Sequence, residues 1–140
     1  MTSLNLENLV EVGQLKREPG DQLEFEGLVR SGRARLDDSK QELLSIEGRF
    51  DLAYNAVHAL SLAALRWHGY RPDNRYVVFQ CLPHTLGVGP EVWRVLAHCH
   101  SVRNSGEYEG FLDLTEQLVQ DLIEAAGIVL GLVEDLGPVL

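Results

Sequence analysis

Six side chains capable of hydrogen bonding or acid–base chemistry occur close together in the second half of the chain. They are Arg94, His98, His100, Arg103, Asn104 and Tyr108. Arginine offers a planar fork of N–H donors, an asparagine amide both donates and accepts, and a tyrosine phenol donates or stacks. Such a set suits recognition of a phosphate group or the edge of a nucleobase. A purely structural role is the alternative, with Arg103 paired to Glu107 or a carboxylate of the last helix, and Asn104 only ending its own helix.

Motifs for metal, phosphate-loop or nucleophile chemistry are missing from the sequence. His98 and His100 are two residues apart, so on a helix they point to different sides, whereas helical metal ligands are spaced three or four apart. The chain contains no Cys-x-x-Cys, no Gly-x-Ser-x-Gly and no glycine-rich phosphate loop. We therefore expect neither a metal site nor a cofactor.

Charge is distributed unevenly along the chain. The net charge is −9, which argues against general nucleic-acid affinity, because that affinity comes mainly from Lys and Arg. Residues 66–103 nevertheless carry five arginines against Asp73 and Glu91, whereas residues 104–140 carry eight acidic side chains and no basic one. The middle segment can therefore form a local basic site. The alternative is that the acidic chain is simply soluble.

Composition places the chain among globular proteins. Its 140 residues are 45% hydrophobic and 24% charged, which is typical of one domain with a buried core. No apolar stretch approaches the ~20 residues that cross a bilayer, so we expect no membrane segment. The first residues, MTSLNLENLV, lack the basic and apolar regions of a secretory signal. We therefore expect a cytoplasmic protein in which Cys81 and Cys99 are reduced.

Apolar residues at helical spacing predict an all-α fold. In residues 49–68 the apolar positions step by three or four, at Phe50, Ala53, Val57, Leu60, Ala64 and Trp67. A long helix is expected over 22–46, capped by Asp21, and its apolar seam includes Leu43 and Ile46. The small residues Gly32 and Ser39 in that seam would let a neighbouring helix approach closely.

Three further helices complete the predicted order. Residues 75–82 favour a strand by residue type, but a lone strand would lack a partner, so we expect a short helix ended by Pro83. The next helix begins at Pro90 and is interrupted at residues 104–106. The last helix is capped by Asp113 with Glu116. Its glycines, Gly127 and Gly131, suit a second helix crossing there.

The expected architecture is an antiparallel up-down bundle of four to five helices. Residues 1–20 form an N-terminal arm or short helix that ends at Pro19-Gly20, and residues 21–140 form a single bundle. Because each helix is apolar along one seam, the bundle can present a second apolar face to a partner chain. A homodimer is therefore expected, with a monomer as the alternative.

Over roughly residues 22–136 the sequence resembles the HEPN family (higher eukaryotes and prokaryotes nucleotide-binding domains). The resemblance rests on a long first helix, the alanine-rich second helix within SIEGRFDLAYNAVHALSLAALRWHGYR, the string RNSGEYEG after the third helix, and a final amphipathic helix. The family signature is an arginine, often followed by Asn, His or Asp, with a histidine four to six residues further on. Arg103 and Asn104 match its first two positions, and Tyr108 occupies the histidine position.

The resemblance implies a HEPN-like bundle over residues 21–140 that dimerises with its arginine motifs facing each other. Many relatives are metal-independent RNases acting as toxins, or partners of minimal nucleotidyltransferases in toxin–antitoxin pairs. In the active relatives the histidine and arginine assist attack by a ribose 2′-hydroxyl. A phenol, with a pKa of about 10, is a poor general base at neutral pH. Tyr108 therefore predicts little or no RNase activity. Arg94 and His100 have a spacing within the family's range, but they lie a helical turn or more before the expected position, so they are a weak substitute for the signature.

Three functional hypotheses remain open. The first is a non-catalytic, dimeric HEPN-like protein that binds a nucleotide, RNA or a nucleotidyltransferase-type partner through Arg103, Asn104 and Tyr108, with Arg94 as a further candidate. The second is an RNase toxin that uses Arg103 with His98 or His100. The third is a helical protein-interaction module without a ligand.

Overall fold

The computed structural model describes residues 4–110 and 113–140, and within these ranges the side chains of all but residue 4 and residues 107–109. The described part contains seven helices: α1 (Leu4–Glu11), α2 (Gln22–Ser39), α3 (Ile46–Trp67), α4 (Arg75–Gln80), α5 (Leu82–Thr85), α6 (Pro90–Glu109) and α7 (Glu116–Glu134). Its only sheet is a two-stranded antiparallel pair, β1 (Leu15–Arg17) and β2 (Tyr70–Pro72). The predicted all-α fold is confirmed.

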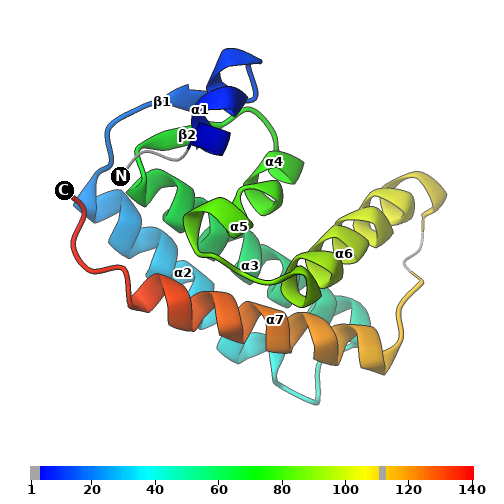
Figure 1. Cartoon of the computed structure of the whole chain (residues 1–140). Helices are drawn as coiled ribbons and strands as arrows, with labels where there is room; N and C mark the ends of the chain where they lie inside the picture. The colour runs from blue at the N-terminus through cyan, green and yellow to red at the C-terminus, as the bar shows by residue number, and fades with distance from the viewer. Residues whose placement is uncertain (1–3, 111–112) are drawn as a thin grey trace.

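The four long helices alternate in direction along the chain, which gives the up-down arrangement expected from the sequence (Figure 1). α3 lies at the centre and packs along both α2 and α7, while α6 packs against α7 and α4. None of the described helices combines the length and apolar character needed to cross a membrane.

Polar side chains fix where the helices begin, because they accept hydrogen bonds from the otherwise unpaired N–H groups of the first turn. The Asp21 carboxylate accepts from the Leu23 amide of α2 at 2.9 Å, as the sequence predicts. Ser45 caps α3 in the same way, accepting from the Gly48 amide at 3.0 Å. The last helix is capped by Thr115 rather than by Asp113, and its hydroxyl accepts from the Leu118 amide at 3.1 Å.

The first long helix is shorter than predicted. α2 ends at Ser39, not at residue 46, and Leu43 is fully exposed in the connection to α3. Ile46 is the first residue of α3 rather than the last of α2. The helical spacing of leucine and isoleucine continues by coincidence through the connection, whereas the Ser45 cap starts a new helix.

The third long helix, α6, is longer than predicted. The predicted interruption at residues 104–106 is wrong, because α6 continues to Glu109. It ends at Gly110, whose φ of +83° is the left-handed conformation that commonly terminates helices at glycine. Asn104 therefore lies on a regular helix. The short helix predicted for residues 75–82 is present as α4 and α5, and Pro83 lies in the first turn of α5 instead of ending α4.

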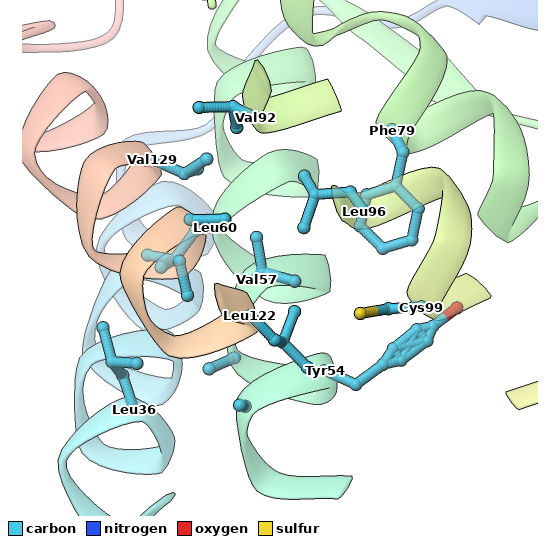
Figure 2. Packing of buried hydrophobic residues seen from close by; sticks show 14 of the residues in the cluster. Leu36, Tyr54, Val57, Leu60, Phe79, Val92, Leu96, Cys99, Leu122 and Val129 are labelled. Carbon is cyan, nitrogen blue, oxygen red and sulfur yellow. The ribbon is translucent and has the colours of Figure 1, made fainter. Parts of the chain in front are cut away.

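The N-terminal arm packs on one end of α3. Its apolar side chains contribute to a small buried cluster made of Leu6, Leu15, Leu65, Tyr70, Val77 and Cys81. The larger cluster surrounds α3, where Leu36 of α2 and Leu122 and Val129 of α7 face it from two sides (Figure 2). On a third side, Leu96 and Cys99 of α6 and Phe79 of α4 surround the Tyr54 ring.

Glycines in α2 and α7 have different roles. A Cβ on Gly32 would lie 2.6 Å from Leu60 Cγ, so this position lets α2 and α3 approach closely, as predicted. A Cβ on Gly127 or Gly131 would meet nothing within 4 Å, and both residues are exposed. The helix crossing expected at these two glycines is therefore wrong for the described part of the chain.

Candidate functional site

A cavity of about 460 Å³ opens between α6 and the start of α4. Its lining comes from three separate segments of the chain: Tyr54, Asn74, Arg75, Tyr76, His100, Arg103 and Asn104. We call this cavity the α4–α6 pocket. Asn74 caps α4 by accepting from the Val77 amide at 3.1 Å, which fixes the start of that helix at the pocket edge.

Helical geometry explains which of the predicted residues reach the pocket. His100, Arg103 and Asn104 are spaced i, i+3 and i+4, so they share one face of α6. Arg94 precedes Arg103 by two and a half helical turns and therefore points to the opposite side. Arg94 and His98 are both exposed and do not line the pocket. The side chain of Tyr108 lies outside the described residues.

The His100 ring is fixed by polar and aromatic contacts. Its Nδ1 atom lies 2.9 Å from the Tyr54 hydroxyl, and its Nε2 atom lies 3.1 Å from the Asn104 amide nitrogen. Tyr76 stacks on the ring, with centroids 5.0 Å apart and planes 15° from parallel. Both imidazole nitrogens therefore have partners within the pocket.

Arg103 lies between a carboxylate and an aromatic ring. Its Nη1 atom is 3.2 Å from Asp51 Oδ1, and its Cζ atom is 4.7 Å from the centroid of the Tyr54 ring. This placement combines an ion pair with a cation–π contact. The arginine side chain is 25% exposed and that of Asp51 is 63% exposed, so solvent weakens the ion pair. The predicted partner Glu107 has its side chain outside the described residues.

Positive charge accumulates around the pocket. His58, half-buried beside it, has its pKa lowered to about 4, first by burial and then by the positive charges of Arg75, Arg103 and His100. Arg75 is exposed at the rim. The local basic site expected within residues 66–103 therefore has a counterpart in the structure, although only two of the five arginines in that segment line the pocket.

Sequence reasoning missed four of the lining residues: Tyr54, Asn74, Arg75 and Tyr76. Tyr54 lies outside the apolar series that predicts the second helix. Asn74 directly precedes the segment 75–82, and Arg75 and Tyr76 begin it, but that segment was considered only for its secondary structure. The signal that could have found them is Asn74 as an N-cap, because it predicts a helix start with Arg75 and Tyr76 in its first turn.

Metal and thiol chemistry receive no support from the described residues. No group of three or more His, Cys, Asp or Glu side chains there could hold a metal ion. Cys81 and Cys99 are free and buried, and burial raises the pKa of each thiol to about 12. A thiol with so high a pKa is a poor nucleophile at neutral pH.

The pocket combines guanidinium groups, amides and aromatic rings, which is a chemistry suited to phosphate and planar bases. Arg75 and Arg103 supply N–H donors, while Asn74 and Asn104 supply side-chain amides. No family model, no curated protein and no solved structure matches the chain. Inference about function therefore depends on the chemistry of this pocket and on the sequence resemblance.

Proposed function

We propose that this chain is a non-catalytic, homodimeric HEPN-like protein of the cytoplasm that binds a nucleotide or RNA in the α4–α6 pocket. The observation that carries the proposal is the meeting of Arg75, Arg103 and the stacked pair of Tyr76 and His100 in one cavity. Guanidinium groups bind phosphate oxygens through paired N–H donors. Aromatic rings provide surfaces on which a base stacks, whatever its identity.

The hydrogen bonds of His100 favour binding over catalysis. When the Asn104 amide nitrogen donates to Nε2, the proton of the neutral ring lies on Nδ1 and is donated to the Tyr54 hydroxyl oxygen. The lone pair that a general base needs is then engaged by Asn104. Tyr108, at the histidine position of the family signature, is a poor base as well.

A nucleotidyltransferase-type partner protein is an alternative ligand for the same pocket. Carboxylates of a partner engage guanidinium groups as phosphates do. A metal-independent RNase toxin is the alternative activity, and it is favoured by the position of His100 beside Arg103 in one cavity. Cleavage of RNA by the purified chain, lost in His100→Ala and kept in His98→Ala, would replace the binding role with catalysis.

The binding proposal is tested by calorimetric titration of the full chain at low salt. The probes are adenosine monophosphate, inorganic phosphate and a short single-stranded RNA. We expect Arg103→Ala and Arg75→Ala each to weaken binding by about tenfold or more, because each removes charge-assisted hydrogen bonds. Arg94→Ala is the matched control, since it removes the same group from the opposite side of α6, and it should leave binding unchanged.

The three probes separate the sources of affinity. Binding of phosphate alone would identify an anion site, and tighter binding of adenosine monophosphate would add base stacking. Absence of binding to all three probes by the wild-type chain, or equal losses in Arg94→Ala and Arg103→Ala, would contradict the proposal. The remaining hypothesis would then be a helical interaction module without a ligand.

A further inference from the structure

Asp51 of α3 does not line the α4–α6 pocket, but its carboxylate contacts an arginine that does. The Oδ1 atom of Asp51 lies 3.2 Å from Arg103 Nη1. Asp51 and Tyr54 are spaced i and i+3, so they share one face of α3. The Arg103 guanidinium therefore meets that helix twice, with one edge on the Asp51 carboxylate and its Cζ atom 4.7 Å from the centre of the Tyr54 ring.

The second arginine of the pocket is placed differently. Arg75 is exposed at the rim, and the ion pairs found among the described residues do not include it. The pocket lining itself contains no aspartate or glutamate among those residues. An anion that enters can therefore bind Arg75 directly, whereas at Arg103 it meets a guanidinium group that already holds a carboxylate.

The ion pair between Asp51 and Arg103 is accessible enough to exchange. The two side chains are 63% and 25% exposed, and pairs so exposed are weak because water and salt screen them. A phosphate monoester offers a guanidinium group the same kind of acceptor as a carboxylate, with three oxygen atoms and a larger negative charge. The cation–π contact with Tyr54 uses the face of the guanidinium rather than its N–H groups, so it need not change when the anion does.

We propose that Asp51 is a built-in competitor of anionic ligands: a phosphate group binds Arg103 by displacing the Asp51 carboxylate. The inference rests on the proposed function, because it concerns ligands of the same pocket. Affinity falls for two reasons, since the bond to Arg103 has to be exchanged and the bound phosphate then lies near the displaced negative charge. Asp51 therefore weakens the binding of phosphate-bearing ligands and leaves that of an uncharged nucleoside unchanged.

Calorimetric titration of Asp51→Asn at low salt tests this role. Asparagine keeps the size of the side chain and removes its charge, and the exposure of Asp51 makes the change compatible with folding. We expect inorganic phosphate and adenosine monophosphate to bind Asp51→Asn about threefold or more tighter than the wild type, and adenosine to bind both equally. Glu47→Gln is the matched control, because it removes an exposed carboxylate one helical turn earlier on α3, and it should leave every affinity unchanged.

The outcomes separate this inference from the proposed function. Equal phosphate affinity in the wild type and Asp51→Asn, or an equal gain in Glu47→Gln, would contradict the competitor and leave ligand binding by the pocket in place. Weaker binding of both adenosine monophosphate and adenosine to Asp51→Asn would overturn it as well, because the carboxylate would then accept from a ribose hydroxyl.

Two further outcomes concern the pocket itself. Phosphate binding by Asp51→Asn alone would confirm the competitor and contradict ligand binding by the wild-type pocket. If no probe binds the wild type or Asp51→Asn, both proposals are contradicted.

Discussion

His58 and His100 both make edge-type contacts with the Phe79 ring, with ring centroids 6.0 Å and 6.2 Å from it. His58 is half-buried and has positive groups nearby, so the protonated form of its imidazole is disfavoured. The pKa of His58 is lowered to about 4 by burial and by the charges of Arg75, Arg103 and His100. Burial first, and the positive groups at the pocket second, therefore favour the neutral form of His58.

This neutral histidine makes stability depend on pH. The unfolded chain protonates His58 near its ordinary pKa of about 6.5, whereas the folded chain resists protonation down to about 4. The stability that neutral His58 contributes to the folded state is fully present above about pH 6.5. It is lost as pH falls toward about 4, because the unfolded state binds more protons in this window. After allowance for partial exposure, we expect a loss of about 2 kcal/mol from this residue.

Urea unfolding at a series of pH values measures this loss. His58→Gln, which cannot be protonated, should show a shallower decline in the free energy of unfolding across the window than the wild type does. His98→Gln changes an exposed histidine and should keep the full decline. Parallel curves for the wild type and His58→Gln would show that His58 does not titrate differently in the two states.

At the residue scale, the sequence predicted part of the pocket. The cluster of hydrogen-bonding side chains includes Arg103, Asn104 and His100, and the first two also match the signature that the sequence resembles. Their position on one face of α6 was not predicted, because the helix was expected to break at residue 104. Tyr54 lies on α3 and Arg75 on α4, and they precede Arg103 in the sequence by 49 and 28 residues, respectively. Their contribution depends on how α3, α4 and α6 pack, and no local pattern encodes that packing.

At the scale of elements, the contact between α2 and α3 depends on the absence of a side chain. A Cβ at Gly32 would lie 2.6 Å from Leu60 Cγ and 3.2 Å from the Ala56 carbonyl oxygen. The first distance is shorter than packed carbon atoms tolerate, so either the leucine or the helix would have to move. Gly27 lies on the same helix, but a Cβ there would meet nothing within 4 Å.

These two glycines form a matched pair for alanine substitution. Alanine raises helix propensity by about 1 kcal/mol at either position. We expect Gly27→Ala to stabilise the protein by up to about 1 kcal/mol and Gly32→Ala to destabilise it by about 1–3 kcal/mol, because overpacking outweighs propensity at Gly32. Thermal unfolding of the two variants provides the comparison. A stabilised Gly32→Ala would mean that α2 and α3 are not in close contact at this point.

Prediction of the elements succeeded where the signal was local and failed where two local signals competed. Periodicity placed α3 within three residues of its observed start, and Asp21 marked the start of α2. The end of α2 was missed because Leu43 continues the apolar spacing through a connection. Asn104 and Gly106 were expected to break α6, but packing of that helix on α7 and α4 outweighs their low helix propensity. The pairing of β1 with β2 joins segments more than fifty residues apart, so the sequence pattern alone did not show it.

At the scale of the whole molecule, a buried arginine adds a polar connection between the N-terminal arm and the bundle to the β1–β2 pairing and the apolar cluster. The Arg66 side chain, only 3% exposed, donates to the Glu18, Pro19 and Tyr70 carbonyl oxygens at 2.8–3.1 Å. Its Nε atom also donates to Glu24 Oε1 of α2 at 2.7 Å. One guanidinium group therefore satisfies acceptors from the arm, from β2 and from α2. Removing it would take a donor from the buried Tyr70 carbonyl and from the part-buried contacts to Glu18, Pro19 and Glu24.

Arg66→Met retains the length of the side chain and removes every donor. We expect the free energy of unfolding to fall by about 3 kcal/mol, because buried and part-buried acceptors lose a charged donor, although the Glu24 carboxylate keeps its contact with Arg71. The loss of stability should be concentrated in the arm, and hydrogen exchange measures this. The Glu18 amide donates to the Gly69 carbonyl, and it should lose protection from exchange before the amides in the middle of α3 do. Arg35→Met, at an exposed arginine of α2, is the control and should change stability by no more than about 0.5 kcal/mol. A uniform loss of protection over the arm and α3 would show instead that both unfold as one unit, and that Arg66 stabilises the molecule without a separate effect on the arm.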